Sequence, residues 1–253
     1  MIPESLRARL STHDPLLGAW TFLREPLAAE VASGAGYDYV CIDGQHGIHD
    51  YASIVSQLTS IAAGGTALPV VRVPWNEPGF IGQVLDAGAG GVIVPMVNTP
   101  EQAEAVVRAC RYAPVGARSL GPIGASTRYG STYVSAANEF ITVIPMIETV
   151  EAVGNVEKIA ATPGVDALYI GPADLSMTLG VPPAMDQDDA RFNDALLRVV
   201  AACQAAGIVP GIHSDPALVA KRRDQGFRMI TIGYDLQPMI AGLHRALNDG
   251  RRA

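Results

Sequence analysis

Polar residues follow several of the short apolar runs in this chain, at the points where those runs end. They are Asp43, Gln45 and His46 after the second run, Arg72 in the third, and Glu148, Asp174 and His213 after the fifth, sixth and seventh. If the runs are parallel strands of one sheet, their carboxyl ends lie at the same edge, and these side chains share one site. The set provides a base, a cation, two carboxylates and a second histidine, which are groups typical of an enzyme active site.

The two carboxylates favour a metal site. Glu148 and Asp174 are 26 positions apart and follow consecutive apolar runs. Neighbouring strands lie about 4.8 Å apart, so both carboxylates are within reach of one cation. Without thiolates or clustered histidines, they suit a hard ion such as Mg²⁺ or Mn²⁺, with positions left open for water and a chelating substrate. The alternative is that each acid caps the helix that follows it. Their occurrence beside His46 and Arg72 favours the metal.

Arg72 lies in an otherwise apolar run and therefore needs an anion, because an unpaired buried charge is very costly. That anion is either an internal Asp or Glu, or a carboxylate or enolate oxygen of a substrate. His46 comes three residues after Asp43 in a turn flanked by glycine. We expect Asp43 to orient the imidazole of His46, which would then act as a general base.

Lysine usage excludes one kind of chemistry. The chain has only Lys158 and Lys221, both in expected helices away from the ends of the apolar runs. A Schiff-base mechanism requires a lysine at the site, so carbanion chemistry here would need a metal as electron sink. The last two loops lack a glycine-rich phosphate cradle, which favours carboxylate substrates over phosphate esters.

Eight continuous apolar runs alternate with helical segments, as in parallel strands buried on both faces. The runs are residues 17–22, 37–42, 68–73, 91–94, 141–147, 167–170, 208–212 and 229–232. The helical segments are 27–33, 51–63, 80–86, 100–110, 150–161, 191–206, 216–224 and 236–247. This pattern predicts a single α/β domain over residues 1–253, a (β/α)8 or TIM barrel with its site at the carboxyl ends of the strands. The rival is an open doubly wound sheet, but no Gly-x-Gly-x-x-Gly opens a helix after the first run. Residues 111–133 are expected to be irregular.

Composition excludes several partners. The 18 Lys and Arg against 25 Asp and Glu give a net charge of −7, and an acidic surface repels nucleic acid. No apolar run approaches the roughly 18 residues needed to cross a bilayer, and residues 1–10 lack the apolar segment of a signal peptide. Cys41, Cys110 and Cys203 are without metal-ligand spacing, which favours free thiols in a reducing compartment. We therefore expect a cytoplasmic protein without nucleic-acid or membrane partners.

Six motifs occur in order between about Gly18 and Gly233. They are Asp43-Gly44-Gln45-His46-Gly47, Val71-Arg72-Val73-Pro74-Trp75-Asn76, Val94-Pro95-Met96-Val97, Arg118-Ser119-Leu120-Gly121-Pro122, Met146-Ile147-Glu148-Thr149 and Ile170-Gly171-Pro172-Ala173-Asp174-Leu175-Ser176. Together they resemble the metal-dependent class II pyruvate aldolases of the 4-hydroxy-2-oxoheptanedioate aldolase family, which belongs with the citrate lyase β-subunit superfamily.

The resemblance implies a (β/α)8 barrel whose last helix is exchanged between subunits of a homo-oligomer, often a hexamer built as a trimer of dimers. Glu148 and Asp174 match the ligands of a divalent metal, Mg²⁺, Mn²⁺ or Co²⁺. Arg72 matches the arginine that steadies the enolate. His46, with Asp43, matches the base.

Further matches concern the substrates. The segment Gly171-Pro172-Ala173-Asp174 matches the one that holds the keto-acid carboxylate. Asp86 matches an acid that reaches a neighbouring subunit's site, although its surroundings alone favour an ordinary helix surface. Gln45 departs from the glutamate of most relatives, which leaves the surroundings of His46 less negative and affects the expected rate and pH optimum. His213 replaces an expected aliphatic residue, and we hypothesise that it favours polar, hydroxylated aldehydes.

The predicted function is that of a metal-dependent aldolase, a carbon–carbon lyase. It would reversibly cleave 4-hydroxy-2-oxo acids to an aldehyde and pyruvate, or a related 2-oxo acid such as hydroxypyruvate, through an enolate. Other reactions of the same enolate remain alternatives, namely oxaloacetate decarboxylation and acyl-CoA lyase chemistry, although the acidic chain lacks an evident basic patch for a nucleotide. A third alternative is a barrel that binds a metal but catalyses no reaction.

Overall fold

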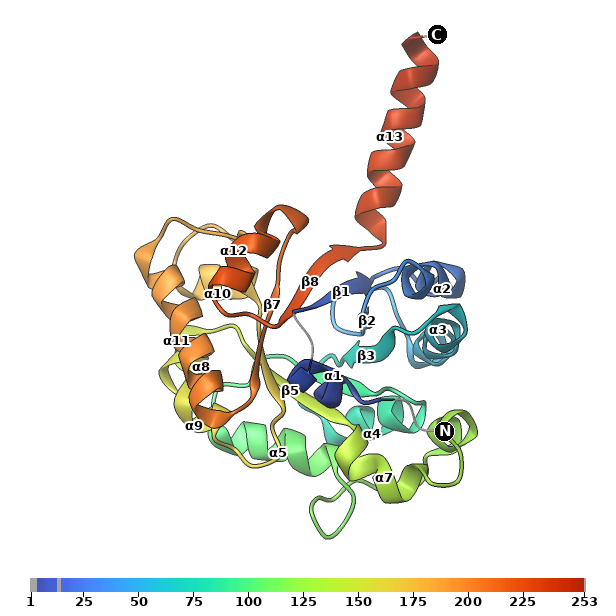
Figure 1. Ribbon diagram of the computed structural model, residues 1–253, viewed down its shortest axis with the longest axis vertical. Helices are drawn as coiled ribbons and strands as arrows, with labels where there is room; N and C mark the ends of the chain where they lie inside the picture. The colour runs from blue at the N-terminus through green and yellow to red at the C-terminus, as the bar shows by residue number, and fades with distance from the viewer. Residues whose placement is uncertain (1–3, 13–14, 253) are drawn as a thin grey trace.

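Eight parallel strands close into a barrel in chain order in the computed structural model, which describes residues 4–12 and 15–252 (Figure 1). The strands are β1 (Leu16–Thr21), β2 (Tyr39–Asp43), β3 (Leu68–Arg72), β4 (Gly91–Val94), β5 (Thr142–Ile147), β6 (Ala167–Ile170), β7 (Val209–His213) and β8 (Met229–Tyr234). The predicted (β/α)8 barrel is confirmed, and every expected strand is present with ends that differ by at most two residues. The continuous apolar runs form strands because both faces are covered, one by the barrel interior and one by helices.

Helices lie between successive strands, before β1 and after β8. They are α1 (Leu6–Thr12), α2 (Pro26–Gly34), α3 (Tyr51–Gly64), α4 (Pro78–Asp86), α5 (Pro100–Cys110), α6 (Ile123–Tyr129), α7 (Tyr133–Phe140), α8 (Val150–Gly154), α9 (Val156–Ala160), α10 (Pro172–Thr178), α11 (Ala190–Ala206), the 3₁₀ turn η1 (Pro216–Leu218), α12 (Val219–Asp224) and α13 (Leu236–Arg252). All eight expected helical segments are helical, but the one expected over residues 150–161 divides at Asn155 into α8 and α9.

The expectation of an irregular stretch over residues 111–133 holds for residues 111–122 but is wrong for residues 123–129, which form α6. The helix is only seven residues long, includes Gly124 and has no side-chain hydrogen bond at its N-cap, Pro122, so its sequence carries little helical signal. Its buried residues Ala125 and Tyr129 show what stabilises it instead, namely packing against the barrel's outer layer.

Two clusters of buried side chains form the core. The larger lies between the strands and the surrounding helices. The smaller fills the barrel interior and includes Leu6 and Leu10 of α1 together with Leu16 and Leu68 from the beginnings of strands. α1 therefore closes the amino-terminal end of the barrel and leaves the carboxyl end available for a site.

A layer of hydroxyl groups crosses the barrel interior. The Thr231 hydroxyl lies 2.9 Å from the Tyr39 hydroxyl and accepts a hydrogen bond from Tyr169 at 2.5 Å. Gly18 lies under the Tyr39 ring, where a Cβ atom would come within 2.0 Å of it. Glycine is therefore required there for steric reasons, and the three hydroxyl groups satisfy one another in a layer that water does not reach.

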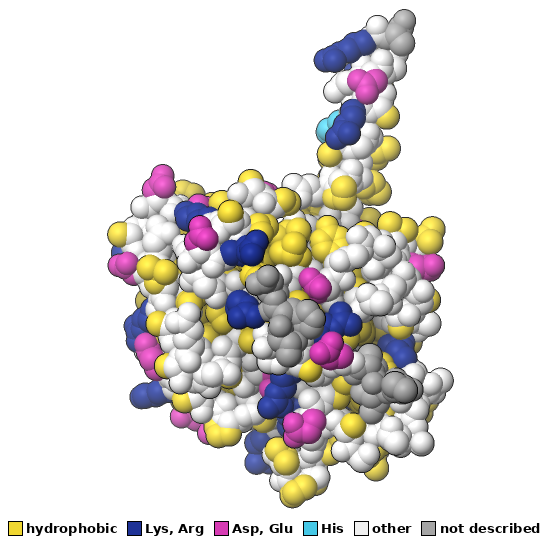
Figure 2. Space-filling model, in the orientation of Figure 1, with side chains coloured by type: hydrophobic (Ala, Val, Ile, Leu, Met, Phe, Trp, Pro, Cys, Tyr) yellow, Lys and Arg dark blue, Asp and Glu magenta, His cyan; other side chains and the backbone are white. Residues whose placement is uncertain are grey.

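The last helix, α13, projects away from the barrel as an arm (Figure 1). None of its described residues is buried, and Met239, Ile240, Leu243 and Leu247 are 45–64% exposed. A cavity of about 650 Å³ opens between α2, β8 and the base of the arm, where Figure 2 shows apolar side chains gathered. No helix among the described residues has both the length and the apolar character to cross a membrane.

Candidate active site at the carboxyl end of the barrel

A pocket of about 180 Å³ opens at the carboxyl ends of the strands. Its walls are Trp20, Phe22, His46, Arg72, Met146, Gly171, Pro172, Ala173, Asp174, Met185 and His213. The structure therefore brings together seven of the residues selected from the sequence, contributed by the ends of β2, β3, β6 and β7. Of the other selected residues, Asp43 and Glu148 lie directly behind this wall, whereas Gln45 and Asp86 do not line the pocket.

Arg72 and Asp43 form a buried ion pair on neighbouring strands, where they occupy directly paired positions of β2 and β3. The Arg72 Nε and Nη2 groups donate to the two Asp43 carboxylate oxygens at 2.9 and 2.6 Å. The guanidinium also lies over the Trp20 ring, 4.6 Å from its centroid. Of the alternatives left open by the sequence, the internal acid is therefore the partner of Arg72. Its Nη1 group has no hydrogen bond to the described residues and remains for a ligand.

The expectation that Asp43 orients the His46 imidazole was wrong. Both Asp43 oxygens are engaged by Arg72, and Oδ1 also accepts from the backbone N–H groups of Gln45 and His46, at 3.0 and 3.2 Å. Asp43 thus positions His46 through its backbone, by fixing the turn after β2. The imidazole is exposed at the pocket wall, as a group that exchanges protons with a substrate should be.

Glu148 is buried behind the pocket at the end of β5. Its Oε1 accepts from the backbone N–H of Met96 at 2.7 Å, and a Cβ atom on Gly171 would come within 2.5 Å of Oε2. The alternative that Glu148 caps a helix is wrong, because the side chain of Thr149 caps α8. Burial raises the pKa of Glu148 to about 7, opposed by the Met96 N–H and reinforced by the nearby Asp174 carboxylate.

Asp174 lies in the first turn of α10, where Gly171 is the N-cap, so Asp174 is not the cap either. Pairing of Ile147 with Ile170 places Glu148 next to Gly171 at the same edge. No cluster of three or more His, Cys, Asp or Glu residues suited to a metal occurs within residues 4–12 and 15–252. Two like-charged carboxylates, one with a raised pKa, nevertheless fit a hard divalent cation that takes its remaining ligands from substrate and water.

His213 packs its ring edge-to-face against Trp20, with centroids 4.9 Å apart. Burial, together with the charge of Arg72, lowers the pKa of His213 to about 4. The ring is therefore neutral near pH 7, with one nitrogen that donates and one that accepts hydrogen bonds. Gln45 is half-buried behind the pocket, and its Oε1 is buried without a hydrogen-bond partner in the described structure.

Asp86 lies elsewhere, at the end of α4. Its Oδ1 accepts from Arg118 Nη2 at 2.7 Å, and both residues line a separate hollow of about 370 Å³. The Arg118 side chain is fully buried, over the Tyr112 ring at 4.5 Å and with Nη1 donating to the Tyr133 hydroxyl at 3.2 Å. Within one chain, Asp86 is therefore not part of the pocket at the barrel mouth.

Five residues of the site, Trp20, Phe22, Met96, Met146 and Met185, were given no role in it from the sequence. Trp20 lies in the predicted first strand, and a search for inward-pointing aromatic residues at strand ends would have found it. Met185 comes from a loop without periodicity, and Met96 contributes only its backbone N–H, in a left-handed conformation with φ 56°. Neither of these two roles leaves a signal in residue type.

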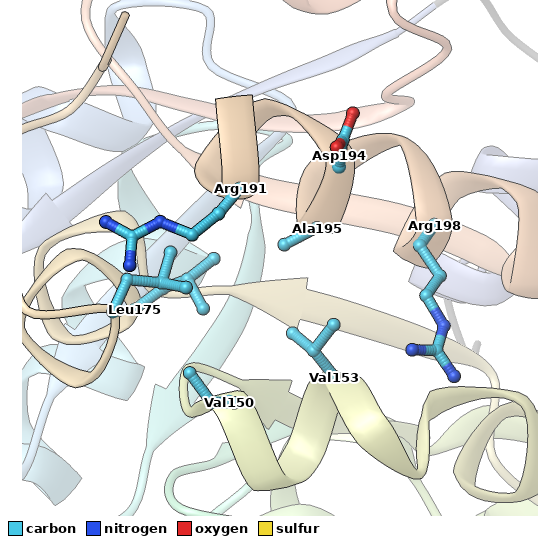
Figure 3. A pocket seen from close by; sticks show the side chains of 8 residues that line it. Val150, Val153, Leu175, Arg191, Asp194, Ala195 and Arg198 are labelled. Atoms are coloured by element: carbon cyan, nitrogen blue, oxygen red, sulfur yellow. The ribbon is translucent and has the colours of Figure 1, made fainter. Parts of the chain in front are cut away.

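Size does not distinguish the candidate site from other hollows. The hollow in Figure 3, also about 180 Å³, lies outside the barrel between α8, α10 and α11 and is mostly apolar, with Val153, Leu175 and Ala195 on its walls. Its Arg191 and Arg198 already pair with Asp189 and Glu157. Of these two hollows, the one at the barrel mouth combines, among the described residues, the exposed His46 imidazole, the Asp174 carboxylate and Arg72, whose Nη1 has no hydrogen bond to them.

Comparison with known proteins agrees with this chemistry. Residues 16–241 match the HpcH/HpaI aldolase/citrate lyase family. A hydroxypyruvate/pyruvate aldolase from Paraburkholderia phytofirmans is 39% identical, with 97% of each chain covered. A 4-hydroxy-2-oxovalerate aldolase from Novosphingobium aromaticivorans is 44% identical, with 92% of this chain and 88% of that protein covered. The crystal structure of a HpcH/HpaI aldolase/citrate lyase family protein from Burkholderia cenocepacia superposes with a TM-score of 0.90 at 38% identity, covering 98% of this chain and 100% of that one. The chain therefore belongs to the HpcH/HpaI aldolase/citrate lyase family.

Proposed function

We propose that this protein is a metal-dependent aldolase that reversibly cleaves 4-hydroxy-2-oxo acids to an aldehyde and a 2-oxo acid, either pyruvate or hydroxypyruvate. The observation that carries the proposal is that Asp174 lines one pocket with Arg72, which keeps one nitrogen free, while the Glu148 carboxylate is buried directly behind the Gly171 wall of that pocket. The names of the relatives, hydroxypyruvate/pyruvate aldolase and 4-hydroxy-2-oxovalerate aldolase, support the same reaction class.

Glu148 and Asp174 would hold the divalent cation, and Mg²⁺, Mn²⁺ and Co²⁺ all suit carboxylate oxygens. When bound, the cation supplies Lewis acidity, which acidifies the C3 protons of the 2-oxo acid. Gly171 leaves the space that Glu148 Oε2 occupies, so the segment from Gly171 to Asp174 can approach it closely. The backbone N–H groups of Ala173 and Asp174 would hold the substrate carboxylate.

The chain's own residues perform the remaining steps. Arg72 Nη1 donates to the oxygen that gains negative charge in the enolate, and Asp43 and Trp20 hold the guanidinium in place. In the cleavage direction His46, directly or through a water, takes the proton of the C4 hydroxyl as the C3–C4 bond breaks, and then delivers that proton to C3 of the enolate; in the reverse direction it takes a C3 proton and gives it to the oxygen of the aldehyde. Since Asp43 fixes Arg72 and the His46 turn together, one carboxylate aligns the oxygen-binding and proton-transfer groups.

The test is release of the 2-oxo acid from 4-hydroxy-2-oxo acids, measured first in chelator and then with each metal. We expect no release in chelator and saturable release with at least one of Mg²⁺, Mn²⁺ and Co²⁺. Release that is equally fast in chelator would contradict the proposal, whereas metal binding without release would favour a non-catalytic barrel. Release of CO₂ from oxaloacetate alone would favour the decarboxylase alternative.

His213 would determine the preference for hydroxylated aldehydes. Its neutral ring reaches the pocket from β7, and no hydrogen bond engages its nitrogens in the described structure. We expect His213→Leu to lower kcat/KM for glyceraldehyde relative to succinic semialdehyde by about tenfold, the value of one hydrogen bond. An unchanged ratio in the variant would contradict this role.

We further propose that α13 is exchanged between subunits of a hexamer and that Asp86 contributes to a neighbouring subunit's site. The exposed apolar residues of the arm and the 650 Å³ cavity at its base support the exchange. Light scattering should give about six times the 26.5 kDa of one chain. The double variant Ile240→Glu, Leu243→Glu should give a smaller species, and a wild-type monomer would contradict the proposal.

The buried free cysteines and the acidic surface support a cytoplasmic location.

A further inference from the structure

A loop from the β6 unit crosses the barrel mouth and presents one side chain to the pocket. It links α10 and α11 over residues 179–189 and has no regular secondary structure. Met185, near its middle, lines the pocket together with Asp174 and His213. Met185 is 37% exposed, whereas Glu148 and Arg72 are 2% and 6% exposed. It therefore belongs to the outer, open part of the pocket and not to the deep part, where oxygen atoms of the 2-oxo acid would bind.

A buried arginine from the next unit holds this loop. The Arg222 side chain is 0% exposed on α12, and its Nη2 donates to the Met185 carbonyl at 2.6 Å and to Asp186 Oδ1 at 3.0 Å. Its Nη1 donates to Gln225 at 2.8 Å. A buried guanidinium requires such partners, because an uncompensated charge is strongly destabilising. Burial of the Arg222 guanidinium is unfavourable unless these hydrogen bonds form, so they attach the Met185 backbone to α12.

The flanks of the loop are held independently. The Gln187 side chain donates to the Ser176 hydroxyl at 3.2 Å and to the Pro182 carbonyl at 2.5 Å. Asn193 donates to the Gln187 carbonyl at 3.0 Å. With Gln187 attached to α10 and α11, the hydrogen bonds of Arg222 to the Met185 carbonyl and to Asp186 hold the Met185 segment at the pocket.

We propose that Met185 is a specificity-determining residue of the aldehyde site and that Arg222 is the positioning residue that holds it there. The inference rests on the proposed aldolase function. The 2-oxo acid occupies the deep part of the pocket, so the aldehyde approaches the enolate from the open side, past Met185. The thioether chain forms an apolar wall there, with His213 as the polar residue of the same rim. The ligand class is an aldehyde whose carbon chain packs against Met185.

The first experiment compares Met185→Ala with the wild type in aldol addition of pyruvate to acetaldehyde, propanal and hexanal. Truncation enlarges the outer pocket and makes room for a longer carbon chain. The ratio of kcat/KM for hexanal to that for propanal should therefore rise about tenfold, which is the discrimination expected from contacts with a few methylene groups. Deuterium exchange at C3 of pyruvate, which needs no aldehyde, should remain within about twofold of wild type. The same hexanal-to-propanal ratio in both proteins would overturn the proposal.

The second experiment compares Arg222→Met with Lys221→Met. Lys221 forms an exposed ion pair with Asp186 at 2.6 Å, one position along α12, but has no bond to the Met185 carbonyl. Arg222→Met should raise the KM for propanal about fivefold or more without changing the rate of C3 exchange. Lys221→Met should leave both unchanged, and Arg222→Lys should restore part of the affinity. Equal effects of the two methionine variants would overturn the positioning role.

Asp186→Ala provides a variant on the exposed side if Arg222→Met does not fold. It removes one of the two loop contacts of Arg222 Nη2, and we expect a smaller rise in the aldehyde KM with unchanged C3 exchange. No change in the aldehyde KM would count against the contact. A wild-type protein that exchanges no C3 proton with any metal would refute the proposed function itself, whereas normal exchange with an unaltered aldehyde preference in all variants would refute only this inference.

Discussion

On the β2–β3 side of the pocket, the Asp43 carboxylate and the Arg72 guanidinium neutralise each other through two hydrogen bonds between buried side chains. On the β5–β6 side, burial, reinforced by the neighbouring Asp174 carboxylate, raises the pKa of Glu148 to about 7. Both pairs consist of side chains at or just after the carboxyl ends of adjacent strands. The charges of Asp43 and Arg72 balance each other, whereas the negative charges of Glu148 and Asp174 would need a cation to balance them.

The difference separates two tasks of the site. The Asp43–Arg72 pair is formed without any ligand, so Arg72 Nη1 is already oriented before substrate arrives. The Glu148–Asp174 pair brings like charges close together, and a divalent cation held by these carboxylates, as we propose, would offset that repulsion. The first pair should therefore govern the stability of the metal-free protein, and the second should govern metal binding and turnover.

The largest expected effect is the loss of cleavage activity when one carboxylate of the Glu148–Asp174 pair is removed. Asp174→Ala leaves Glu148 as the single carboxylate, and we expect metal-dependent cleavage to fall by about 10³-fold or more, because one ligand does not retain the cation. The matched control is Glu151→Ala, which removes an exposed acid from the first turn of α8, as Asp174 lies in the first turn of α10. Comparable losses in both variants would mean that Asp174 acts through the helix dipole and not as a ligand.

In the Asp43–Arg72 pair, the substitution Asp43→Asn leaves the Arg72 charge buried without an anion. We expect the free energy of unfolding of the metal-free protein to fall by about 3–5 kcal/mol in urea titrations. Glu157→Gln breaks the equally bidentate pair of Arg198 and Glu157, whose side chains are 46% and 56% exposed, and should cost less than about 1 kcal/mol. Similar losses would show that burial is not what distinguishes the Asp43–Arg72 pair.

The smallest expected effect is a pH dependence from Glu148. Its pKa is about 7 in the folded chain against 4.5 as the ordinary value, so the folded state keeps a proton between these pH values that the unfolded state releases. The stability contributed by this group is complete below about pH 4.5 and decreases as the pH rises to about 7, by up to about 3 kcal/mol. His213, whose pKa is lowered to about 4, contributes an opposite rise in stability over the same pH range to both proteins. Urea titrations in chelator at pH 5 and pH 8 should therefore give a change in the free energy of unfolding that is less favourable in the wild type than in Glu148→Gln, by about 2–3 kcal/mol. An identical pH dependence in the two proteins would contradict the assignment to Glu148.

The fold was predictable because its signal is repeated eight times. Each parallel strand is a continuous apolar run, and the closed barrel follows from the number and order of the runs. α6 was not predictable, because Gly124 and the uncapped Pro122 give a local sequence that becomes helical only through packing. The division at Asn155 directly follows Gly154, and the low helix propensity of these two residues is a signal that the sequence did carry.

Residue types predicted the site, but not its pairings. The chemistry of Arg72 and Asp43 was evident separately, yet only the register of β2 against β3 shows that they bind each other instead of Asp43 binding the His46 ring. Met185 and Arg222 lie 37 positions apart in segments without a motif, and their contact uses a backbone carbonyl, which any residue carries. Sequence patterns locate strand ends, whereas loop positions depend on tertiary hydrogen bonds.

We propose that residues on both sides of the pocket act together to convert pyruvate to its enolate. Deuterium exchange at C3 of pyruvate tests this proposal most directly. Proton NMR in D₂O would follow loss of the methyl signal, first in chelator and then with added Mg²⁺, Mn²⁺ or Co²⁺. Our account predicts exchange only with metal, and none in Asp174→Ala. Exchange in chelator, or undiminished exchange in Asp174→Ala, would contradict it.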